Sequence, residues 1–106
     1  MKKLHHMTIK ANQRKLEYLN EELTALEKLI KDFLPEGFII FECPECENGK
    51  NFTTYYIMDE EDESFIDGLR SDNEIEQWEY NRAFEWLPTY NRMQREFKAL
   101  NLIVNQ

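Results

Sequence analysis

Hydrophobic residues in the first third of the chain recur every three or four positions, which predicts an amphipathic helix over about residues 8–34. From Leu16 onward the steps alternate between three and four, as at the a and d positions of a coiled coil; the apolar positions are Ile9, Leu16, Leu19, Leu23, Leu26, Ile30 and Phe33. Pro35 and Gly37 are expected to end this helix, because proline cannot continue it and glycine tolerates left-handed backbone angles.

The pattern changes to aromatic and β-branched residues over about 38–58, which predicts a β-hairpin. Asn48-Gly49 is a strong turn signal because both central residues of a type I′ turn need positive φ. This turn predicts three facing pairs: Glu47 with Lys50, Phe41 with Tyr56, and Ile39 with Met58. Pro44 has no N–H to donate, so the first arm is expected to be an edge strand or to contain a bulge.

Polar signals divide the second half of the chain into a loop and two predicted helices. Five consecutive carboxylates repel one another, so residues 59–64 are expected to form an acidic loop. Ser71 and Glu74 have the spacing of a capping box, which predicts a helix over about 72–87. Pro88 falls within the next apolar series and is expected near the first turn of another helix, over about 89–103. One continuous helix kinked at Pro88 is the alternative.

Together these elements predict a single domain over residues 1–106 of the α+β class, mostly helical. Long N-terminal and C-terminal amphipathic helices pack together, with the central β-hairpin and a short middle helix on one side. The chain has 7 Phe, 5 Tyr and 2 Trp, which is enough apolar material for one modest core. Internal packing of the N-terminal stripe is favoured over a homodimer seam, because the C-terminal helix carries a matching stripe.

Charge is distributed unevenly along the chain. Residues 36–79 contain 14 acidic and 2 basic residues, a net charge of −12, whereas the whole chain carries −8. Such a block repels nucleic acid and acidic membranes and attracts basic protein surfaces. No apolar run approaches the roughly 20 residues of a membrane helix. The N-terminus lacks the features of a secretory signal and the two cysteines form no disulfide framework, so a cytoplasmic protein is expected.

Cys43 and Cys46, separated by two residues, form the sharpest local motif. Thiolates at this spacing on a tight turn can bind one zinc ion, and the segment resembles one half of a zinc ribbon. A complete site would need a second chain, or His5 and His6 from a folded-back N-terminus. A reduced structural pair is the favoured interpretation. Redox catalysis is disfavoured because acidic neighbours oppose formation of a thiolate.

The remaining residue patterns do not form a recognised catalytic centre, so a non-enzymatic protein is expected. His5 and His6 are the only histidines, and three scattered glycines do not make a phosphate-binding loop. The carboxylates of residues 59–63 lack the spacing and the glycine of a calcium loop. No cofactor is expected, with zinc at Cys43 and Cys46 as the alternative.

The leading hypothesis is a small acidic protein that docks on a basic surface of a partner protein, such as the surface with which a nucleic-acid-binding enzyme holds its substrate. Carboxylates would replace phosphates and tyrosines would act as anchors. The candidate residues are Asp59, Glu60, Glu61, Asp62, Glu63, Asp67, Asp72, Glu74, Glu76, Glu79, Tyr55 and Tyr56. The two tyrosines are adjacent on a predicted strand and face opposite sides, so at least one is a surface candidate.

By size and charge, though without a shared motif, this chain is similar in kind to small phage inhibitors of the anti-CRISPR or anti-restriction type. Neither direct binding to nucleic acid nor binding to a membrane is expected. The alternative is a homodimeric structural or regulatory module, in which Cys43 and Cys46 of two chains share one zinc ion.

Overall fold

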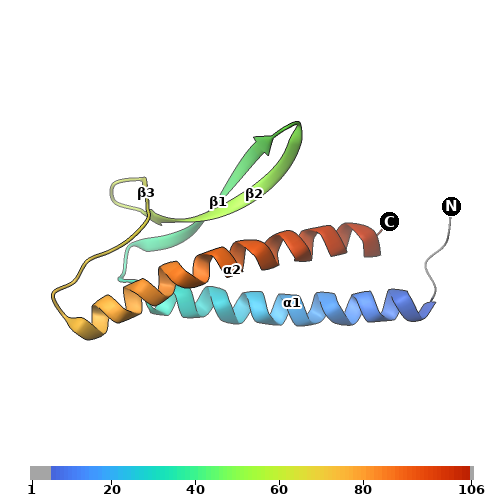
Figure 1. Ribbon diagram of the computed structural model, residues 1–106, viewed down its shortest axis with the longest axis horizontal. Helices are drawn as coiled ribbons and strands as arrows, with labels where there is room; N and C mark the ends of the chain where they lie inside the picture. The colour runs from blue at the N-terminus through green and yellow to red at the C-terminus, as the bar shows by residue number, and fades with distance from the viewer. Residues whose placement is uncertain (1–5, 106) are drawn as a thin grey trace.

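The computed structural model describes residues 6–105 (Figure 1) and consists of two long helices and a three-stranded antiparallel sheet. The elements in chain order are α1 (His6–Asp32), β1 (Phe38–Glu47), β2 (Lys50–Asp59), β3 (Ser64–Ile66) and α2 (Glu74–Val104). The helices lie side by side and antiparallel, and the sheet packs on one side of the pair (Figure 1). The predicted α+β class is therefore confirmed. Neither helix has a stretch that is long and apolar enough to cross a membrane.

The core lies where the two helices meet and beneath the sheet. Its buried residues come from both helices, from β2 and from the segment after α1: Leu19, Leu23, Ile30, Leu34, Tyr55, Ile57, Ala83 and Tyr90. The apolar stripe of α1 is thus used inside the chain, as predicted. The helix ends near the predicted position, where Phe33 N–H donates to the Leu29 carbonyl at 3.1 Å and Gly37 has a φ of 94°.

The hairpin has the register that its turn predicts. Glu47 pairs with Lys50, and the φ angles of Asn48 and Gly49 are 53° and 78°, as a type I′ turn requires. The other two predicted pairs, Phe41 with Tyr56 and Ile39 with Met58, also form. β1 is an edge strand, as the proline in it predicts.

Pro44 fits into β1 because of its place in the hydrogen-bond pattern. Antiparallel pairs alternate between those that exchange backbone hydrogen bonds and those that do not. Glu47 and Lys50 flank a two-residue turn and exchange them, so the pair of Pro44 with Thr53, three positions along, does not. The nitrogen of Pro44 therefore faces away from β2, and its missing N–H costs the β1–β2 ladder nothing.

The acidic loop is shorter than predicted. Residues 60–63 form a tight turn that includes Glu63 at a φ of 52°, but residues 64–66 form β3, which the sequence did not predict. Ile66 pairs with Ile57, and Phe65 pairs with Met58. Three residues are too few for an alternating pattern to be recognised, so only the pairing with β2 identifies this strand.

The prediction of two helices at 72–87 and 89–103, and with them a separate short middle helix, is wrong: residues 74–104 form one continuous helix, α2, as in the alternative. Pro88 lies inside it and leaves the carbonyl of residue 84 without its usual donor. Packing holds both halves in place, because Ala83 and Tyr90 are buried on either side of the proline. Trp86 also contacts Phe33 of α1, with ring centroids 5.0 Å apart. These tertiary contacts outweigh one lost backbone hydrogen bond.

The start of α2 also differs from the predicted capping box. The N-cap is Asn73, whose Oδ1 accepts hydrogen bonds from the N–H groups of Ile75 and Glu76 at 2.9 and 3.1 Å. Ser71 precedes the cap, and its Oγ accepts from Asn73 N–H and donates to the Glu76 carboxylate. Ser71 therefore stabilises the approach to the helix rather than its first turn.

Candidate docking face

The sheet has one covered face and one open face. Side chains alternate along a strand, so Tyr55 and Ile57 point toward the helices while Tyr56 and Met58 point away from them. Both helices lie on the same side of the sheet (Figure 1), and within residues 6–105 no element covers its outer face. The part of the outer face away from the hairpin tip is nevertheless apolar: it carries Ile39, Phe41, Tyr56, Met58 and Phe65.

Three aromatic rings, which we call the aromatic patch, lie together on this outer face. Phe65 of β3 stacks on Tyr56 of β2, with centroids 4.8 Å apart and planes 12° from parallel. The ring centroid of Phe41 in β1 is 5.5 Å from that of Phe65. Phe41 and Phe65 remain 38 % and 48 % exposed, respectively. Rings at this spacing stabilise one another and are also typical anchors of protein interfaces.

Hydrogen bonds fix the tyrosine ring of the patch. The Tyr56 hydroxyl donates to Oε1 of Glu45, and the Thr54 hydroxyl donates to Oε2 of the same carboxylate at 2.9 Å. These bonds lower the pKa of Glu45, chiefly through Tyr56, and they raise the pKa of Tyr56, chiefly through Glu45. The pair therefore remains a neutral phenol bonded to a carboxylate across the neutral pH range.

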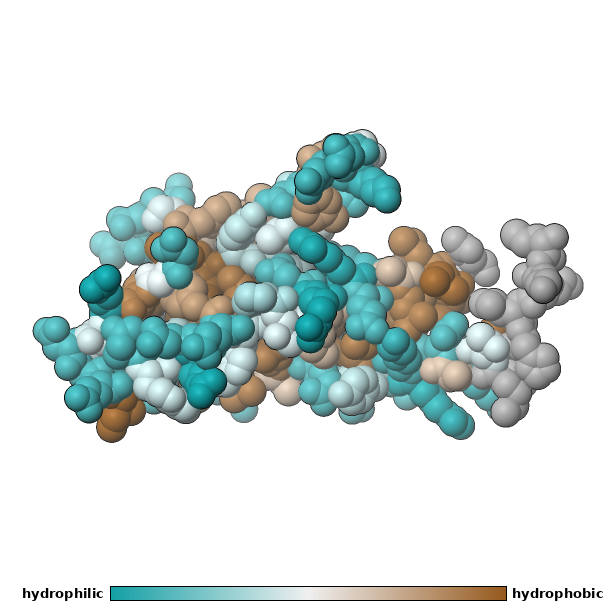
Figure 2. Space-filling view, viewed as in Figure 1, coloured by the Kyte–Doolittle hydropathy of each residue, from teal (hydrophilic) through white to brown (hydrophobic). Residues whose placement is uncertain are grey.

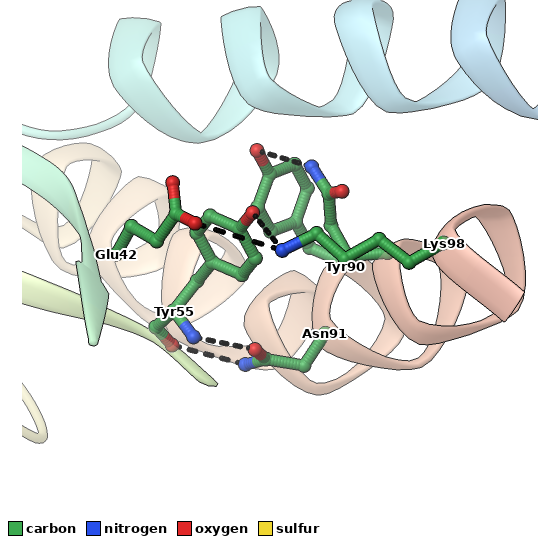
Figure 3. Close-up of polar contacts among 6 residues, drawn as sticks. Glu42, Tyr55, Tyr90, Asn91 and Lys98 are labelled. Atoms are coloured by element: carbon green, nitrogen blue, oxygen red, sulfur yellow. Dashed lines mark hydrogen bonds and ion pairs between the residues drawn. The ribbon is translucent and has the colours of Figure 1, made fainter. Parts of the chain in front are cut away.

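Tyr55 lies on the opposite face and is not available to a partner. Its side chain is only 8 % exposed and meets Tyr90 edge to face, with centroids 5.2 Å apart. Its hydroxyl accepts a hydrogen bond from Nζ of Lys98 at 3.2 Å (Figure 3). Of the two tyrosines that the sequence singled out, Tyr56 is therefore the surface residue and Tyr55 is a core residue.

The carboxylates at positions 59–63, the acidic turn, border the aromatic patch because the turn joins the strands that carry Tyr56 and Phe65. Asp59 is half-buried and its Oδ1 accepts a hydrogen bond from Glu61 N–H at 3.0 Å. The other four carboxylates are exposed. Asp59 therefore shapes the turn, while Glu60, Glu61 and Asp62 extend freely into solvent.

The other predicted acidic residues lie outside the strands that carry the aromatic patch. Asp67 and Asp72 are exposed in the segment between β3 and α2, and Glu74, Glu76 and Glu79 lie in the first two turns of α2. Acidic groups at a helix N-terminus stabilise its dipole, which gives Glu74 and Glu76 a structural role. The start of α2 and the acidic turn both lie at the end of the molecule opposite the N and C labels (Figure 1), where hydrophilic residues cover much of the surface (Figure 2).

The two cysteines do not face one another. Cys43 and Cys46 lie three residues apart in a regular strand, so Cys43 is on the outer face and Cys46 is on the face toward α2. Within the described part of the chain, no three His, Cys, Asp or Glu side chains lie together as metal ligands. His5 and the side chain of His6, the other expected zinc ligands, are outside the described residues.

Phe41 and Phe65 were not selected from the sequence, although both fall at outward positions of the strands. The alternation along β1 identifies Phe41 as an outer-face residue once the Asn48-Gly49 turn sets the register. No local signal identifies Phe65, because β3 is recognised only by its pairing. Comparison with protein-family models, with curated proteins and with solved structures finds no match for this chain.

Proposed function

We propose that this protein is a small, non-enzymatic binding module that docks on a basic surface of a partner protein through the outer face of its sheet. The observation that carries the proposal is the open aromatic patch beside the acidic turn. The partner surface is of the kind that normally holds nucleic acid, and the carboxylates of the turn take the place of phosphates. Docking then blocks nucleic acid from that surface, as an inhibitor of the anti-CRISPR or anti-restriction type does.

The two parts of this face have different physical roles. Exposed carboxylates act over about 10 Å at moderate salt, so the acidic turn speeds encounter with a basic surface. The aromatic patch acts only in contact, where burying Phe41 and Phe65 removes apolar surface from water and slows dissociation. We therefore expect added salt to weaken binding by slowing association, while the contribution of the aromatic patch to affinity remains at high salt.

The alternative of a zinc-linked homodimer has less support. The apolar stripe of α1 is already packed against α2 and the core, so a coiled coil between two chains would have to expose it. Cys43 and Cys46 point to opposite faces of β1, so one chain does not present both thiols to one metal ion in this conformation. Two free thiols on a hairpin fit a reducing compartment such as the cytoplasm.

The experiment is affinity capture from a nuclease-treated lysate of the source cells at low salt, followed by elution with a duplex DNA fragment. We expect the immobilised protein to retain a nucleic-acid-binding protein that DNA displaces. The triple variant Glu60→Gln, Glu61→Gln, Asp62→Asn removes three charges and keeps Asp59. Each removed carboxylate forms one exposed ion pair with the basic partner, worth roughly 0.5 kcal/mol, so the variant should lose about tenfold in affinity for the partner.

A matched control removes the same charge elsewhere: Glu17→Gln, Glu21→Gln, Glu22→Gln changes exposed positions of α1. Equal capture by the wild type and the acidic-turn variant would contradict acidic docking. Displacement by salt but not by DNA would show that the partner uses a basic surface that does not bind nucleic acid. Recovery of this protein alone, together with zinc, would favour the homodimer.

A further inference from the structure

A groove lies between the tip of the hairpin and the C-terminal half of α2, along the edge of β2. Its volume is about 720 Å³, which is within the range of ligand pockets. The hairpin contributes Pro44, Cys46 and Phe52, and α2 contributes Ala99 and Leu102. Leu102 is 68 % exposed. Figure 2 shows hydrophobic residues over this end of α2, with the hairpin tip standing away from them.

The edge of β2 that faces this groove is largely unpaired. β3 reaches along β2 only as far as Ile57, so the edge continues without a strand partner toward the hairpin tip. At Tyr55 the side chain of Asn91 fills the place of a strand (Figure 3): its Oδ1 accepts from Tyr55 N–H at 2.6 Å and its Nδ2 donates to the Tyr55 carbonyl at 3.0 Å. The side-chain amide of Asn91 thus makes the two hydrogen bonds that the backbone of a neighbouring strand would make.

The backbone groups of Thr53 and Asn51 point the same way as those of Tyr55. Alternate residues of an antiparallel strand direct N–H and C=O to the same edge. Among the residues that the structure describes, no strand or side chain pairs with Thr53 or Asn51 on this edge. The groove therefore has a wall with spare backbone donors and acceptors, opposite a wall of helical side chains.

The helical wall is cationic, although the chain as a whole carries −8. Arg95 is exposed with its guanidinium 5.2 Å from the Phe52 ring centroid, and it makes no ion pair within residues 6–105. Lys98 also lines the groove and lies 3.6 Å from the Glu42 carboxylate. Glu45 is the one acidic lining residue, and both its oxygens accept hydrogen bonds from Thr54 and Tyr56.

We propose that this groove binds an extended acidic segment of a partner protein, which adds to the edge of β2 as a further strand. Backbone hydrogen bonds to Thr53 and Asn51 would supply affinity, as in other cases of strand addition. Apolar side chains of the segment would contact Leu102 and Pro44, and a carboxylate would pair with Arg95. This site goes beyond the proposed function, because it takes an acidic ligand and shares no residue with the aromatic patch or the acidic turn.

The test is an NMR titration of the ¹⁵N-labelled protein with a hexapeptide of alternating valine and glutamate, blocked at both ends. We expect the amide signals of Asn51, Thr53 and Arg95 to shift and to saturate at millimolar peptide. Arg95→Glu is expected to weaken binding about tenfold or more, since it replaces attraction by repulsion. Arg92→Glu, an exposed position of α2 that does not line the groove, is the matched control and should change affinity less than about twofold.

Two control peptides separate strand addition from simple charge attraction. The same hexapeptide with alternate backbone nitrogens methylated cannot form the ladder, and a hexapeptide of alternating valine and lysine has the opposite charge. Both should bind at least about tenfold more weakly. No shift at millimolar peptide, equal binding of either control, or equal effects of Arg95→Glu and Arg92→Glu would overturn the proposal. Shifts at these residues that grow with protein concentration alone would overturn it in favour of a second copy of the chain.

Discussion

Replacing Asn91 by alanine tests the polar link between the sheet and α2. The variant loses both hydrogen bonds to the Tyr55 backbone, at 2.6 and 3.0 Å, and leaves a half-buried N–H and C=O without a protein partner. Each bond contributes about 1 kcal/mol, and an unpaired group adds to the loss where water reaches it poorly. Alanine is the better helix former and recovers about 0.5 kcal/mol. The expected net loss of unfolding free energy is about 2 kcal/mol.

Urea denaturation followed by circular dichroism measures this loss, with an m-value equal to that of the wild type. In thermal unfolding a loss of this size lowers the Tm by roughly 10 °C for a chain of this length. Asn81→Ala is the matched control, because Asn81 is exposed on the same helix and only accepts a bond from Gln77 at 2.9 Å. If the unfolding free energies of the two variants differ by less than about 0.5 kcal/mol, the Asn91 hydrogen bonds do not hold the sheet to α2 in the way described.

Two further predictions concern the helix proline and the bonded pair on the outer face. Pro88→Ala restores a donor for the carbonyl of residue 84, so urea denaturation should show a gain of about 1–3 kcal/mol; a loss would show that α2 requires the proline. An NMR titration of the carboxyl carbons should place the pKa of Glu45 below that of an ordinary glutamate, and Tyr56→Phe should return it toward that value. The free energy of folding that this pair contributes is fully present above the ordinary glutamate pKa of about 4.3, and it is lost as the pH falls through the lowered pKa of Glu45. If the pKa of Glu45 is the same in Tyr56→Phe as in the wild type, Tyr56 is not the cause of its shift.

Local signals predicted the features that depend on neighbouring residues. The Asn48-Gly49 turn predicted the strand register, because positive φ at both positions selects one turn type and hence one set of pairs. The apolar stripe of α1 and its end near Pro35 were likewise predictable from helix periodicity and proline chemistry.

Features that depend on contacts between distant segments were not predictable. The sequence left two alternatives at Pro88, and burial of Ala83 and Tyr90 against other elements decides for a continuous α2. The choice of Tyr56 over Tyr55 as the surface residue depends on which face of the sheet the helices cover. Asn91 is an ordinary polar helix residue until β2 is placed beside it, so nothing near it in the sequence indicates its role.

Pro44 also affects how the molecule resists self-association. A free strand edge is a template on which further chains can add and eventually aggregate. The nitrogen of Pro44 points to the free edge of β1, so an incoming strand would find no donor there. β1 is thus a poor template for aggregation, and strand addition is directed to the short, enclosed edge of β2, where a ligand must also fit against α2.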